Sequence, residues 1–169
     1  MTDSTAPATG AYTTDGVPHG VTSLTPHLVV SPAAAALEFY ERAFGARVLD
    51  VTRMGDVVGE ASLDLGNGRF TVSDPLPAYG IVAPDPAAAT YSLALHVPDV
   101  DAVVERAVAA GATLREAPTT FVSGDRYGSV LDPFGVRWTV MTRVEDLSPE
   151  ESARRVARWA AEQGAAAQG

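Results

Sequence analysis

The feature of this sequence that most constrains its fold is an internal repeat. Residues 30–45 hold the end of an apolar strand, a helical run and a glycine, and residues 97–111 hold the same order, one residue shorter. Three strand-like runs follow each glycine. A repeat of this length can arise by chance in an alanine-rich chain, but the matching order of elements favours duplication. The repeat therefore predicts two βαβββ modules.

We predict an α+β fold in which the two modules pair to form a curved mixed sheet around a cleft. The helices are expected on the outer face, which leaves the inner face open to a small ligand. The predicted boundaries are a disordered tail at 1–21, module one at 22–74, a linker rich in Pro and Ala at 75–90, module two at 91–146, a helix at 147–163 and a second tail at 164–169.

Capping signals predict where the first and last helices begin. Ser31 and Pro32 have the residue types of a helix cap and a first helical residue. Ser148 is followed by Pro149 and, three residues on, by Glu151, which is the pattern of a capping box.

Composition limits the classes of partner. The net charge of −9 disfavours nucleic acid and anionic membranes, since both require clustered Lys and Arg. The absence of cysteine excludes disulfides, thiolate zinc sites and cysteine nucleophiles. Neither a signal peptide nor an apolar run of membrane-spanning length is present in the sequence, so we expect a cytoplasmic protein.

Strand alternation sorts side chains between the two faces of the sheet. In the first expected strand, 23–30, it places Leu24, Leu28 and Val30 toward the helices, and Thr25 and His27 toward the cleft. A solvated polar face explains this alternation equally well. The other side chains expected on the cleft face are Glu60, Ser92, His96, Arg137 and Thr139.

Three segments carry a family resemblance: "TPHLVVSPAAAALEFYERAFGARVL", "LHVPDVDAVVERAVAAGATL" and "GDRYGSVLDPFGVRWTVMTRVEDLSPEE". They resemble the vicinal-oxygen-chelate superfamily, the group of glyoxalases, bleomycin-resistance proteins and dioxygenases, and most closely its PhnB-like branch. The resemblance covers about residues 22–158. It implies paired βαβββ modules, often in a homodimer. In enzymes of the family, His and Glu side chains hold a divalent metal that chelates substrate oxygens.

The metal-ligand positions implied by the resemblance have changed residue type here. They fall on Thr25, Ser92 and Thr139, and a fourth position, near Glu60, keeps a carboxylate. One carboxylate with three neutral hydroxyls is a poor site for zinc, nickel or iron. We therefore expect a cleft without the usual metal site.

Two histidines keep a metal site open as an alternative. With Glu60, His27 and His96 could form a two-histidine, one-carboxylate set for Zn, Ni, Mn or Fe. Without a metal, His27 and Glu60 could form a general acid–base pair. The simpler interpretation gives all three side chains ordinary hydrogen bonds to ligand, protein or water.

Two arginines and a tyrosine are further candidates for ligand binding. Arg126 and Tyr127 lie in "GDRYG" beside the expected cleft mouth, and Arg137 begins the last strand. They could bind an anionic or aromatic group. Alternatively, Arg126 pairs with Asp125 or Asp132, and Arg137 extends to solvent.

The sequence thus predicts a protein that binds a small organic molecule, such as an antibiotic or another natural product, and forms a homodimer. The alternative is a lyase, isomerase or dioxygenase that uses His27, Glu60 and His96. A structural or regulatory module is a third interpretation, favoured if side chains fill the cleft.

Overall fold

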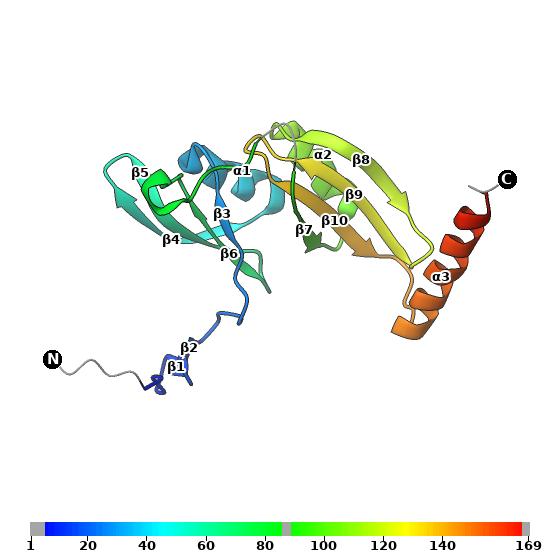
Figure 1. Ribbon diagram of the computed structural model, residues 1–169, viewed down its shortest axis with the longest axis horizontal. Helices are drawn as coiled ribbons and strands as arrows, with labels where there is room; N and C mark the ends of the chain where they lie inside the picture. Colours follow the sequence, from blue (N-terminus) through cyan, green and yellow to red (C-terminus); the bar gives the residue numbers. More distant parts are fainter. Residues whose placement is uncertain (1–5, 86–88, 167–169) are drawn as a thin grey trace.

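The computed structural model describes residues 6–85 and 89–166 and contains two modules with the same order of elements (Figure 1). Module one consists of β3 (His27–Val29), α1 (Ala33–Phe44), β4 (Arg47–Met54), β5 (Val57–Asp64) and β6 (Arg69–Ser73). Module two consists of β7 (Ser92–His96), α2 (Val100–Ala109), β8 (Thr113–Thr120), β9 (Asp125–Leu131) and β10 (Arg137–Arg143). The prediction of two βαβββ modules is confirmed.

Each module has its own four-stranded mixed sheet. The strand orders are β3-β6-β5-β4 and β7-β10-β9-β8, and in both sheets the first strand runs parallel to the last. Among the described residues no backbone pairing joins the two sheets, and α1 packs against α2 instead. Within one chain the expected curved sheet is therefore divided into two halves, with a free edge at β3 and at β7.

The register of the strands reproduces the repeat residue by residue. Each sheet has a bulge at the same place, between Val48 and Asp50 in β4 and between Leu114 and Glu116 in β8. Each sheet also has a corresponding row of paired residues across its four strands. The rows are His27–Thr71–Ser62–Asp50 in module one and Ala94–Thr139–Ser129–Glu116 in module two.

An aromatic cluster joins the modules into one core. Tyr40 of α1 lies within 6.5 Å of five other rings, measured between centroids, and two of those rings come from module two. Its hydroxyl donates a hydrogen bond of 2.9 Å to Asp132 Oδ2, and both residues are buried. Burial raises the pKa of Tyr40, and the nearby Asp132 raises it further. The members of the cluster are Phe39, Tyr40, Phe44, Phe70, Phe134 and Trp138.

The cap of α1 differs from the prediction, although the helix covers the predicted run "AAAALEFYERAF". The helix begins at Ala33, and neither Ser31 nor Pro32 caps it with a side chain. Asp74, which follows β6, accepts the Ala33 backbone N–H at 2.9 Å with one carboxylate oxygen. The other oxygen accepts the Val58 N–H at 2.8 Å. One carboxylate thus joins the helix to its own sheet.

The C-terminal helix α3 (Pro149–Ala166) begins where the sequence predicts. Ser148 Oγ accepts the Glu151 N–H at 3.2 Å, which confirms the cap. The reciprocal half of the box is absent from the described contacts, because the Glu151 carboxylate pairs with Arg155 at 3.0 Å. Trp159 packs edge-on against Phe121, with ring centroids 4.9 Å apart.

The N-terminal region contains more structure than expected. β1 (Thr13–Thr14) and β2 (Val17–Pro18) form a short hairpin inside the segment predicted as a tail, of which residues 1–5 lie outside the described part. β3 is shorter than the predicted strand 23–30, so Leu24 precedes it and is 81% exposed, not buried.

A one-turn 3-10 helix, η1 (Pro77–Tyr79), lies in the predicted linker. Residues 86–88 of that linker fall outside the described part. No helix in the described chain combines the length and the apolar character needed to cross a membrane.

Candidate functional site

Two of the candidate residues meet on the open face of module two. Ser92 on β7 and Thr139 on β10 share a hydrogen bond of 2.8 Å between their hydroxyls. The two strands are parallel neighbours, so both side chains lie on the face away from α2. Two neutral oxygens occupy positions at which the resemblance expects metal ligands.

A charged network lies beside this hydroxyl pair. Ser129 on β9 donates to Glu116 Oε2 at 2.5 Å, and Arg137 Nη2 donates to the same oxygen at 2.6 Å. Arg137 also donates to Ser129 Oγ at 3.1 Å. Arg137 therefore stays on the sheet face, and it presents a guanidinium with a carboxylate already bound to it.

His27 is held by two hydroxyls on the open face of module one. Its Nδ1 lies 2.7 Å from Thr71 Oγ1, and its Nε2 lies 3.1 Å from Ser73 Oγ. A neutral imidazole donates through one nitrogen and accepts through the other, which fits two hydroxyl partners. A metal ion could take either nitrogen only by breaking one of these bonds.

The predicted metal set does not come together in one chain. Glu60 lies on β5, which is separated from β3 and His27 by β6, and His96 belongs to the other sheet. Across residues 6–85 and 89–166, no group of three His, Asp or Glu side chains is placed to hold a metal ion. The residues present therefore do not fit the divalent metal of the family.

Arg126 forms an ion pair, but with a different partner from those predicted. Its guanidinium donates two hydrogen bonds of 2.6 Å to Asp101 at the start of α2. These bonds lower the pKa of Asp101 and raise that of Arg126. Pairing with Asp125 or Asp132 was wrong, since Asp125 pairs with Arg143 and Asp132 accepts the Tyr40 hydroxyl.

The side chain of Tyr127 is used in packing. It contacts Phe121 edge-on, with ring centroids 6.3 Å apart. Thr25 lies before β3, where its hydroxyl donates to the Thr22 carbonyl at 3.4 Å. Neither residue joins the Ser92–Thr139 pair in a described hydrogen bond.

Reasoning from the sequence missed four polar residues of the two open faces: Thr71, Ser73, Glu116 and Ser129. A signal for one of them was present. The runs "RFTV" and "RWTV" are counterparts in the repeat, so the residue that corresponds to Thr139 is Thr71 and not Glu60. The role of Glu116 depends on a bulge, which no sequence pattern marked.

A cavity of about 500 Å³ lies between the modules, along the free edge of β7. His96 and Trp138 line it from module two, and Phe70 lines it from module one. A second cavity, of about 310 Å³, lies over His27 and is bordered by Val82 and Tyr91. Space for a small molecule therefore lies beside His27 in module one and beside His96 at the edge of module two.

Comparison with known proteins identifies relatives for most of the chain. Residues 19–140 match the model of the Glyoxalase/Bleomycin resistance protein/Dioxygenase superfamily. The uncharacterized protein Mb0911c of Mycobacterium bovis is 35% identical over 139 residues, which is 76% of this chain and 88% of that protein.

Two solved structures share the fold. TioX from Micromonospora sp. ML1 is 24% identical with a TM-score of 0.60, and the match covers 72% of this chain and 98% of TioX. A gene product of Arabidopsis thaliana is 30% identical with a TM-score of 0.58, over 70% of this chain and 97% of its own.

Proposed function

We propose, from the premise that this chain belongs to the Glyoxalase/Bleomycin resistance protein/Dioxygenase superfamily, that it binds a small organic molecule without the metal of the family's enzymes. An antibiotic or another natural product is the proposed ligand class. The hydrogen bond between Ser92 and Thr139 carries the proposal. Neutral hydroxyls recognise a ligand through hydrogen bonds, but they lack the charge and basicity that hold a transition metal.

The neighbouring network supports binding. Glu116 and Arg137 place a carboxylate and a guanidinium on the same face as the hydroxyl pair. A ligand with both donors and acceptors would find a complementary partner for each. The placement of the chain in the PhnB-like branch belongs to the same proposal and rests on the segment 124–151.

A homodimer is also part of the proposal. β3 and β7 each have an unpaired edge, and an unpaired strand edge is a template for pairing with a second chain. Sedimentation velocity should give twice the mass of the chain. A species of single-chain mass at every protein concentration tested would contradict the dimer.

The binding proposal is tested by calorimetry with bleomycin and a panel of natural-product antibiotics, on protein kept in a chelator. We expect saturable binding of at least one compound in the chelator. Ser92→Ala and Thr139→Val should each weaken that binding roughly fivefold, the effect of losing one hydrogen bond of about 1 kcal/mol. Thr120→Val on exposed β8 is the matched control and should leave the affinity unchanged.

The chelator decides between the two candidate functions. Binding that vanishes in the chelator and returns with Zn, Ni, Mn or Fe would contradict the metal-free proposal and support the enzyme alternative. Bound ligand should also be recovered with its mass unchanged. The contact of 2.7 Å between His27 and Thr71 favours a proton-transfer enzyme as the second candidate. In that case a chemically altered product forms, and His27→Ala stops its formation.

A further inference from the structure

Arg69 and Arg137 occupy corresponding positions in the two modules but have different surroundings. Both begin the last strand of their module, where the strand register places Arg69 opposite Asp64 and Arg137 opposite Leu131. Arg137 is bound by Glu116 and Ser129. The guanidinium of Arg69 makes no hydrogen bond or ion pair with any other described residue.

The neighbouring residues explain why the Arg69 guanidinium has no ion-pair partner among the described residues. Its strand neighbour Asp64 uses one oxygen to bind Arg47 at 2.8 Å and the other to accept the Gly66 N–H at 2.8 Å. The counterpart of Glu116 in module one is Asp50, whose side chain is one methylene shorter. Asp64 thus lies near two arginines but forms an ion pair only with Arg47, which leaves a local excess of positive charge.

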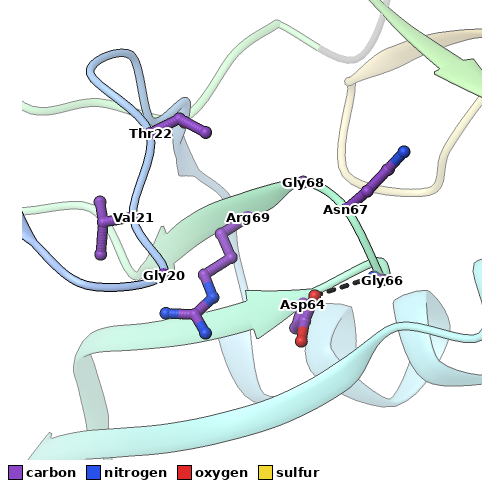
Figure 2. Close-up of a pocket in the computed structure, with 8 residues that line it drawn as sticks. All are labelled: Gly20, Val21, Thr22, Asp64, Gly66, Asn67, Gly68 and Arg69. Atoms are coloured by element: carbon purple, nitrogen blue, oxygen red, sulfur yellow. Dashed lines mark hydrogen bonds between the residues drawn. The ribbon is translucent and has the colours of Figure 1, made fainter.

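The guanidinium points into a cavity of about 320 Å³ and is half-buried (Figure 2). One wall is the segment from Gly20 to Thr22, and the other is the turn Gly66–Gly68. The backbone passes so close that a Cβ added to Gly20 would lie 3.0 Å from Arg69 Nη2. Gly20 also has a φ of +80°, a backbone conformation that favours glycine, and the chain passes close to the charged group here.

This polar cavity adjoins the apolar cavity between the modules. The two share Thr22, Asn67, Gly68 and Arg69 in their walls. The larger cavity, of about 500 Å³, continues past Leu24 and Leu95. A molecule with one charged end and an apolar body would satisfy both parts. The apolar body of such a ligand would cover the side chain of Leu24, which is 81% exposed.

We propose that this joint cavity is a binding site for an organic carboxylic acid with an apolar chain. The carboxylate accepts hydrogen bonds from Arg69, and the hydrocarbon lies along Leu24 and Leu95. The site goes beyond the proposed function, because it contains neither Ser92 nor Thr139.

Calorimetric titration with decanoate, below its micellar concentration at pH 7.5, tests the charged end. We expect one saturable site in the wild type. Arg69→Gln should weaken binding at least roughly tenfold, since it removes a charge-assisted hydrogen bond. Arg53→Gln, at an exposed arginine on β4, is the matched control and should leave the affinity unchanged. Equal affinity for decanoate in the wild type and Arg69→Gln would overturn the proposal.

The apolar end is tested separately. Leu24→Asn should weaken decanoate binding several-fold, and acetate should bind far more weakly than decanoate. Acetate or inorganic phosphate binding as tightly as decanoate would show a plain anion site and overturn the proposal. Loss of decanoate binding as the protein self-associates would show that a second copy of the chain covers the cavity. That result would also overturn the proposal. Ser92→Ala should leave decanoate affinity intact, so this test and the calorimetric test of antibiotic binding fail independently.

Discussion

The hydroxyl of Tyr40 and the carboxylate of Asp132 are 92 residues apart in sequence and joined by a hydrogen bond of 2.9 Å in the shared core of the two modules. Asp132 also accepts from the Trp138 indole N–H at 3.0 Å and from two backbone N–H groups. Burial raises the pKa of Asp132, against the lowering effect of these hydrogen bonds. Because these buried hydrogen bonds join residues of both modules, the stability of each module depends on the other.

Tyr40→Phe should therefore lower the free energy of unfolding by about 1–2 kcal/mol, because a buried carboxylate loses one donor. Urea denaturation measures the change. Tyr79→Phe, at a tyrosine that is 80% exposed, is the control and should leave stability unchanged. Equal stability of Tyr40→Phe and the wild type would show that the hydrogen bond contributes nothing to the junction.

The helix start at Ala33 gives a second prediction. Asp74→Ala should cost about 1–2 kcal/mol, since it leaves the backbone N–H groups of Ala33 and Val58 without their acceptor. Ser31→Ala should cost almost nothing, because Ser31 makes no capping bond. Urea midpoints of the two variants decide the matter. The opposite ranking would mean that the cap is Ser31 after all.

The ion pair between Asp101 and Arg126 predicts a pH dependence. The pKa of Asp101 is lowered from 3.8 by its bonds to Arg126, so the pair stabilises the fold fully above that pH. This contribution is lost as the pH falls from about 3.8 through the lower folded-state pKa. The stability difference between the wild type and Asp101→Asn should shrink in that range. Urea midpoints from pH 7 to pH 3 measure it, and a difference that does not vary with pH would contradict the assignment.

The attachment of α3 includes one aromatic contact, beside the hydrogen bond of Ser152 to the Ser123 carbonyl and the ion pair of Arg155 with Glu145. Trp159→Ala should weaken the docking of α3 by about 1 kcal/mol, the typical contribution of an aromatic pair. Hydrogen exchange in residues 149–166 should then become roughly fivefold faster, with α1 unaffected. Arg158→Ala, next to it on the same helix, is the control. Uniform exchange across both helices in Trp159→Ala would show that α3 is not a separate unit.

The order of elements could be predicted because its signals are local. The helical runs, the strands and the two glycines that end the helices repeat at matching positions, and no long-range knowledge is needed to see them. The cap of α1 could not be predicted in the same way. Its cap is Asp74, which is 41 residues from Ala33 and meets it only after β6 has joined the sheet.

The candidate site was partly predictable for a related reason. Ser92 and Thr139 were both placed on the cleft face by alternation, and the parallel pairing of β7 with β10 brings them together. His27 and Glu60 were placed on one face as well, but β6 lies between their strands. Alternation gives the face of a side chain, whereas the distance between two side chains depends on strand order.

The shared aromatic core has a consequence for how the chain can be divided. Each half carries a complete sheet and helix, yet the hydroxyl of Tyr40 and the ring of Trp138 find their partners across the junction. A backbone cut between residues 81 and 84 should thus yield two fragments that reassociate when mixed. The linker keeps the two halves close together, whereas their association depends on the surfaces that pack against each other.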